Sequence, residues 1–144
     1  MLDQILKDHR YIEAMADEFE ARVSERRPAD FSEVSRIRWA FANALLRHMM
    51  VEDRWMSSQP PRLASRFDQA SARRFQTSVT EHLTQWSIER MTTHWSDYRR
   101  TTLDLLSTLR SRIKQEELEL NPLSARAECA NSLRVKPRTP EAAL

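Results

Sequence analysis

The fold is decided within residues 2–23, LDQILKDHRYIEAMADEFEARV, where apolar side chains recur at alternating steps of three and four residues. This spacing places them on one face of an α-helix, and Asp, Glu and Arg fill the opposite face. The apolar face carries Leu2, Ile5, His9, Ile12, Ala16, Phe19 and Val23. The segment therefore predicts an amphipathic helix that packs against partner helices, with a histidine on its buried side.

The same period continues along the chain in three further segments. Pro28 ends the first helix, because proline disfavours helical geometry in the residue before it. A second helix is predicted from Asp30 to about Met56, a third over about 67–86 and a fourth over about 98–120, with a turn inside 92–97. Two prolines at 60–61 predict a crossover loop between the halves. We expect an all-α, antiparallel up-down-up-down four-helix bundle over residues 1–122.

The end of the chain differs in character from the predicted bundle. After Pro122 the apolar period is lost, and residues 123–144 gather prolines and alanines. We therefore expect 123–144 to form a loosely ordered C-terminal tail.

Composition excludes several classes of protein. The 144 residues fit one domain, and 23 Lys and Arg against 21 Asp and Glu leave a net charge of only +2. No apolar run is long enough to span a bilayer, so a membrane protein is excluded. The glycine count is 0, which excludes the glycine-rich loops of nucleotide-binding folds. Cys129 is the only cysteine, and the first residues are too charged for a signal peptide, so we expect a cytoplasmic protein.

Three histidines fall on the apolar faces of their predicted helices: His9, His48 and His82. A hairpin that turns between residues 28 and 29 puts His9 and His48 at the same height, facing each other. A turn near residue 97 would bring His82 opposite position 112. Glu52 follows His48 by one helical turn, so imidazole and carboxylate point toward one spot. Converging imidazoles and carboxylates inside a helical bundle indicate a first-row transition metal, and iron is the expected one.

The ordered segments Asp8-His9, HMMVE at 48–52, Glu81-His82 and RIKQEELELNP at 112–122 resemble those of hemerythrin-like domains, the HHE cation-binding family. The resemblance covers about residues 2–122. It implies a four-helix bundle with a non-haem di-iron centre that serves dioxygen binding, oxygen or redox sensing, or iron handling. Carried over by position, the metal ligands would be His9, His48, Glu52, His82 and either Glu116 or Glu117.

One departure from the family pattern is Arg112, which stands where the resemblance implies a fourth histidine. Arginine is permanently cationic and has no lone pair for a metal. Either its stem carries the guanidinium toward water, or the guanidinium takes the place of one metal ion and pairs with Glu116 one turn on. The second arrangement predicts a single-metal or a metal-free bundle. The alternative function is accordingly a metal-free regulatory or protein-interaction module.

Other interpretations of the same residues stay open at this point. The histidines could be hydrogen-bonded core residues, and Glu52 could pair with Arg47 or Arg54. The arginines at 62, 66, 73 and 74 suggest nucleic-acid contact, but the small net charge favours a solvated face. No nucleophile and base share a plausible location, so an enzyme is not expected. Dioxygen or another small diatomic molecule is the expected ligand, and a protein partner remains open.

Overall fold

The computed structural model describes the backbone of residues 2–24 and 27–135 and, within these ranges, side chains as far as Leu120. All the regular structure in this part of the chain is helical, as the periodicity predicts, and it contains no strand. The helices are α1 (Leu2–Ser24), α2 (Ser32–Ser57), α3 (Pro61–Ala64), α4 (Gln69–Gln85), α5 (Ile88–Thr93) and α6 (Trp95–Val135).

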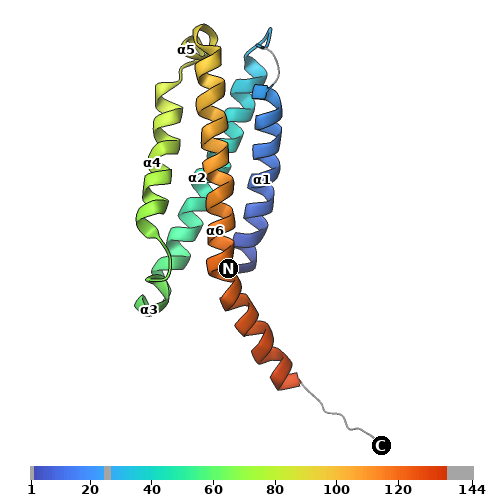
Figure 1. Ribbon diagram of the computed structural model, residues 1–144, viewed down its shortest axis with the longest axis vertical. Coiled ribbons are helices and arrows are strands. Elements are labelled where there is room, and N and C mark those ends of the chain that lie inside the picture. Colours follow the sequence, from blue (N-terminus) through green and yellow to red (C-terminus); the bar gives the residue numbers. More distant parts are fainter. Residues whose placement is uncertain (1, 25–26, 136–144) are drawn as a thin grey trace, which may run out of the picture.

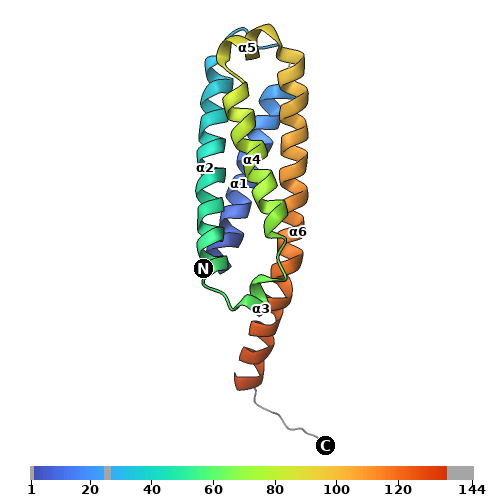
Figure 2. The same cartoon turned by 90° about the vertical axis from the view of Figure 1, so that its left-hand side faces the viewer.

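The four long helices lie side by side (Figures 1 and 2), with α1 and α4 each packed against both α2 and α6. Short α3 joins α2 to α4 at one end, and α5 joins α4 to α6 at the other. The buried face of α1 consists of Ile5, His9, Ile12, Ala16, Phe19 and Val23, which confirms the predicted apolar face except for Leu2, whose side chain is only partly buried. Phe19 meets Phe41 of α2 edge to face, with ring centroids 5.6 Å apart, inside the core.

The turn between the third and fourth long helices comes earlier than predicted. Trp86 leaves helical geometry (φ −103°, ψ 91°) and ends α4. The Ser87 hydroxyl then accepts a hydrogen bond from the Arg90 amide and begins α5. The reversal is therefore complete at His94, and Asp97 already lies inside α6. This shift changes which residues of α4 and α6 lie opposite each other.

The predicted end of the last helix at Pro122 is wrong. Helix α6 continues to Val135, and Figure 1 shows it projecting beyond the other helices. The first part of the expected loosely ordered tail is therefore helical. Residues 136–144 lie outside the described residues.

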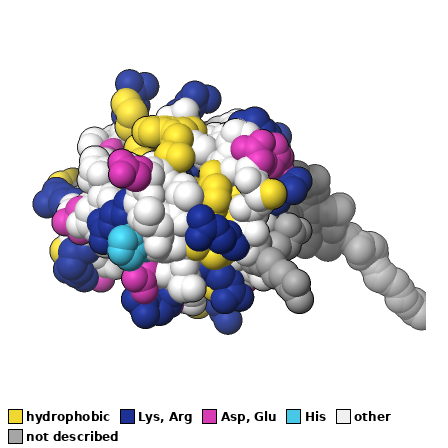
Figure 3. Space-filling model, turned by 90° about the horizontal axis from the view of Figure 1, so that it is seen from above, with side chains coloured by type: hydrophobic (Ala, Val, Ile, Leu, Met, Phe, Trp, Pro, Cys, Tyr) yellow, Lys and Arg dark blue, Asp and Glu magenta, His cyan; other side chains and the backbone are white. Residues whose placement is uncertain are grey.

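The surface carries charges of both signs. Viewed from the end at which α5 lies (Figure 3), Lys and Arg side chains alternate with Asp and Glu, with apolar side chains between them. Among the described helices, none combines the length and the apolar character that crossing a membrane requires.

Candidate metal centre

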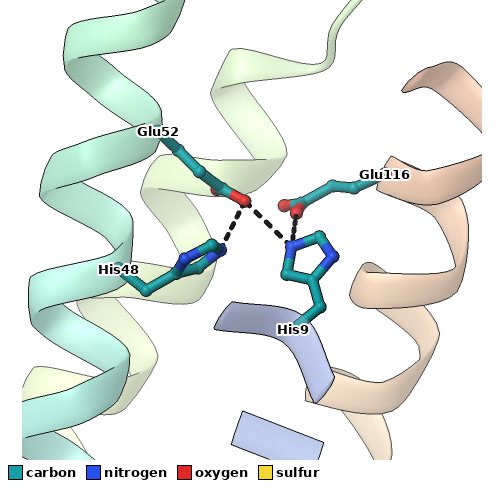
Figure 4. A group of neighbouring side chains, drawn as sticks. All are labelled: His9, His48, Glu52 and Glu116. Carbon is teal, nitrogen blue, oxygen red and sulfur yellow. Dashed lines mark hydrogen bonds and ion pairs between the residues drawn. The ribbon is translucent and has the colours of Figure 1, made fainter. Parts of the chain in front are cut away.

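Four potential metal ligands meet between α1, α2 and α6 (Figure 4): His9, His48, Glu52 and Glu116. Each offers one donor atom, and these atoms all lie within 4.8 Å of one another. His9 is fully buried and His48 is 5% exposed, whereas both carboxylates are partly buried. The helix pairing thus brings together residues that are more than a hundred positions apart in the sequence.

Local geometry explains the positions of the two histidines. His48 and Glu52 are one turn apart on α2, so their side chains leave the helix on the same face. His9 approaches from α1 at the same height, and the two imidazole rings meet edge to face with centroids 4.8 Å apart. The prediction that His9 and His48 face each other is confirmed.

The Nε2 atoms of both histidines point at the carboxylates in the centre of this group. His48 Nε2 lies 2.7 Å from Glu52 Oε1, and His9 Nε2 lies 3.1 Å from the same oxygen. His9 Nε2 is also 3.2 Å from Glu116 Oε2. These separations are ordinary hydrogen-bond distances, and they are also close to the roughly 3 Å that separates adjacent ligands bonded to one ion at about 2.1 Å.

The Nδ1 atoms are held by a second pair of carboxylates. His9 Nδ1 lies 2.9 Å from Glu117 Oε2, and His48 Nδ1 lies 3.2 Å from Asp8 Oδ2. Metal-binding histidines characteristically donate their other ring N–H to a carboxylate, which fixes the tautomer and the ring orientation. Glu117 therefore supports a ligand and does not converge with the donor atoms. Asp8 was not predicted to have this role.

The electrostatics of the group favour positive charge on the two histidines. Burial disfavours the charged form of His9, but hydrogen bonds to Glu116, Glu52 and Glu117 outweigh it and raise the pKa to about 10. Burial likewise opposes the charging of His48, yet its contacts with Glu52 and Asp8 raise its pKa. The neighbouring carboxylates therefore stabilise the protonated form of both histidines.

The two central carboxyl groups titrate in opposite directions. Burial raises the pKa of Glu52, but hydrogen bonds from His48 and His9 lower it below its usual range. Burial, together with the charge of Glu52, raises the pKa of Glu116 despite its hydrogen bond with His9 and the charge of Arg112. Glu52 is thus the carboxylate that remains charged most readily.

Arg112 pairs with Glu116 one turn on, as one of the two predicted arrangements requires. Its Nη2 donates to Glu116 Oε1 at 2.6 Å, and its Nη1 donates to Ser71 Oγ of α4 at 2.9 Å. The guanidinium carbon lies 5.7 Å from the ring centroid of Phe75. A second cation, Arg10, pairs with Glu117. Arg112 therefore holds one oxygen of Glu116, while the other oxygen faces His9.

The expectation that His82 joins this group is wrong. His82 Nε2 lies 3.0 Å from Thr102 Oγ1, and the His82 ring lies against Tyr98 with centroids 5.5 Å apart. Burial, with a smaller effect from the Arg38 charge, lowers the pKa of His82 to about 4. His82 is therefore a neutral core residue that shares a hydrogen bond with Thr102.

The early turn explains this error. Because the reversal precedes residue 97, the α4 residue that reaches Arg112 is Ser71. His82 lies about 16 Å farther along α4 at 1.5 Å per residue. Helix α4 therefore contributes Ser71 and Phe75 near the site, and neither is a strong metal ligand.

A cavity of about 890 Å³ opens on the group. All four donor residues line it, and its remaining walls come from α1, α2, α3, α4 and α6, from Gln59 after α2, and from residues 67–68 before α4. A metal ion held by the four donors would thus face a space that small molecules can enter.

Comparisons with known proteins do not identify a family: no family model, no curated protein and no solved structure matches this chain.

Proposed function

We propose that this protein is a hemerythrin-like metal-binding protein that holds a single first-row transition metal ion, with iron as the native metal. The ligands are His9 Nε2, His48 Nε2 and the carboxylates of Glu52 and Glu116. The proposal includes the antiparallel up-down-up-down arrangement of the four long helices and a cytoplasmic location. One observation carries it: both Nε2 atoms converge on two carboxylates while both Nδ1 atoms are fixed by Glu117 and Asp8.

The donor set suits a divalent ion in both chemistry and charge. Imidazole nitrogen with carboxylate oxygen is a common environment for non-haem iron. Two neutral imidazoles and two carboxylates balance two positive charges, which offsets the cost of burying the ion. A thiolate is absent from the group, so metals that need sulfur ligands are disfavoured.

The contacts of Arg112 favour one metal ion over two. A di-iron centre needs carboxylates that bridge both ions, but one oxygen of Glu116 is already bound by Arg112 at 2.6 Å. The guanidinium supplies positive charge on the side of Glu116 that faces away from His9. His82, a further ligand that the resemblance implied, is instead hydrogen-bonded to Thr102. The site therefore resembles one half of a di-iron centre.

Oxygen or redox sensing, or iron handling, is the role that this site suits. Iron bound here would supply a change of oxidation state and coordination positions open to a small molecule such as dioxygen. The ligands come from three helices, and the cavity gives access from outside.

Metal content after expression in iron-supplemented medium tests this proposal. We expect about one iron per chain in the native protein. The His9→Gln/His48→Gln double variant should lose it, whereas His94→Gln, which changes an exposed histidine outside the group, should retain it. Less than about a tenth of an equivalent in the native protein, or equal iron in the double variant, would overturn the proposal.

A metal-free module is the second candidate, and the ion pair between Arg112 and Glu116 favours it. In this case the imidazolium groups and Arg112 neutralise the buried carboxylates, and function lies on the surface. Arg112→His should then raise the metal affinity from negligible to measurable. If the native protein already binds one ion per chain, this candidate is wrong.

A further inference from the structure

The cavity beside the donor group is much larger than a diatomic ligand requires. Its volume is about 890 Å³, whereas one water molecule occupies about 30 Å³ in the liquid. Pockets that bind organic molecules have volumes of about 300–1,000 Å³. The space therefore suits an organic ligand, which neither the metal nor dioxygen accounts for.

Much of the cavity wall is apolar. Its aromatic side chains include Trp55 from α2, Phe67 before α4 and Phe75 on α4. The rings of Trp55 and Phe67 meet edge to face at 5.8 Å, and Leu109 and Ile113 of α6 add aliphatic surface. These groups would cover the hydrocarbon part of a ligand, since burial of apolar area is favourable by about 25 cal/mol per Å².

Arg112 supplies a cation among the residues that line the cavity. Its side chain is only 17% exposed, and it lies next to Phe75 and Glu116. A guanidinium has five N–H donors, of which two are bonded to Ser71 and Glu116. The remaining three find no acceptor among the described residues. A partly buried guanidinium with unused donors in a cavity is suited to binding an anionic group.

The neighbouring carboxylates limit the charge of that anion. Glu116 is bonded to Arg112, and Glu52 lies in the same cavity, so the local positive charge is small. A dianion such as a phosphate monoester would be repelled by both carboxylates, whereas a monoanion meets less repulsion. A carboxylate also matches the planar fork of arginine.

We infer that this cavity binds a monocarboxylic acid with an apolar body, whose carboxylate pairs with Arg112 and whose hydrocarbon lies against Trp55, Phe67 and Phe75. The inference goes beyond the proposed metal site and does not require the ion, because Arg112 provides the charge. A bound acid would also place its carboxylate beside Glu116 and close the open side of the metal site.

Titration calorimetry with decanoate tests this inference on the full chain, once in EDTA and once after loading with Zn²⁺. We expect a Kd of about 0.1 mM or tighter for this small acid. Decan-1-ol and decyl phosphate should each bind at least about tenfold more weakly, because the first lacks the charge and the second carries too much. Binding of decanoate that is no tighter than that of decan-1-ol would overturn the inference.

Two sets of variants test separately whether decanoate binding depends on the charge of Arg112 and on the volume of the cavity. Arg112→Gln should weaken decanoate binding about tenfold or more and leave decan-1-ol binding unchanged. Ala72→Trp, which fills the cavity, should abolish binding of both, and Ala70→Trp, on the exposed side of α4, should leave both unchanged. Circular dichroism checks that each variant folds, and Ala64→Trp is a second filling variant. Equal decanoate affinity in native protein, Arg112→Gln and Ala72→Trp would refute the assignment.

The two metal conditions distinguish this inference from the proposed function. Arg112-dependent decanoate binding in a protein that binds no metal would support the cavity assignment and refute the metal site. Metal binding without saturable decanoate binding would support the metal site and refute the cavity assignment.

Discussion

Metal binding should release about two protons per ion at pH 7. Each of the four ring nitrogens of His9 and His48 lies within 3.2 Å of a carboxylate oxygen, and a carboxylate only accepts hydrogen bonds. We therefore expect every one of these nitrogens to carry a hydrogen when no metal is bound, which makes both rings imidazolium. The raised pKa values of both histidines agree with this state. A divalent ion must displace the proton from each Nε2.

The pH dependence of the metal affinity follows from the number of protons released. Since two protons leave for each ion bound, the apparent affinity should rise about a hundredfold per pH unit near pH 7. The dependence should weaken at higher pH as the histidines lose their protons, and for His9 this occurs near its pKa of about 10. At acidic pH the raised pKa of Glu116 should add a further contribution, because protonation of this carboxylate also opposes metal binding.

Calorimetry in two buffers of different protonation enthalpy measures the proton count directly. The native protein should release about two protons per Zn²⁺, and His48→Gln should release about one. His94→Gln is the matched control and should still release two. Release of fewer than about one proton by the native protein would show that the histidines are neutral before binding, and the reasoning from the carboxylate contacts would be refuted.

Three further predictions address the support of the site and the core. Asp8→Asn should weaken metal binding about 10- to 100-fold by freeing the ring of His48, whereas Asp3→Asn on the exposed face of α1 should not. Equal metal dissociation constants for the two variants in equilibrium dialysis would show that Asp8 does not support the site. Burial lowers the pKa of His82 to about 4, so as the pH falls the unfolded chain binds a proton at this residue before the folded protein does. Acidification from pH 6.5 to 4 should therefore lower the free energy of unfolding by about 3 kcal/mol. His82→Gln should lose correspondingly less over that range in urea titrations, and parallel pH profiles would count against a neutral buried ring. Phe19→Ala should cost about 3–5 kcal/mol in the same assay, and a loss below about 1 kcal/mol would contradict tight packing around this 2% exposed ring.

The first half of the fold could be predicted from sequence because two simple rules decide it. Apolar periodicity assigns the faces of α1 and α2, and Pro28 places the turn between them. With the turn fixed, the facing of His9 and His48 follows from helix geometry alone. The structure confirms this register through their edge-to-face contact at 4.8 Å.

The second half of the fold was harder to predict, because the sequence contains few local features that mark the turn between α4 and α6. The chain has no glycine, and neither glycine nor proline marks the end of α4 at Trp86. Ser87 is a residue type that often begins a helix, but the residues after it are equally typical of a turn. A misplaced turn displaces the opposite residue by twice the error, which is why His82 was assigned to the wrong level. The role of Ser71 depends on this pairing and could not be predicted.

The contacts outside the donor group depend on tertiary structure. Asp8 reaches His48 across the α1 and α2 interface, and Glu117 reaches His9 across the α1 and α6 interface. Sequence spacing identifies residues on one helix face but does not decide between adjacent carboxylates such as Glu116 and Glu117. By contrast, the pairing of Arg112 with Glu116 could be predicted from the sequence, because these residues are one turn apart on one helix.

The central claim is tested most directly by diffraction from crystals of the iron-loaded protein, with data collected on both sides of the iron absorption edge. The account predicts one anomalous peak per chain, bonded to Nε2 of His9, Nε2 of His48 and the carboxylates of Glu52 and Glu116. No peak at this position, or two peaks bridged by Glu116, would contradict it.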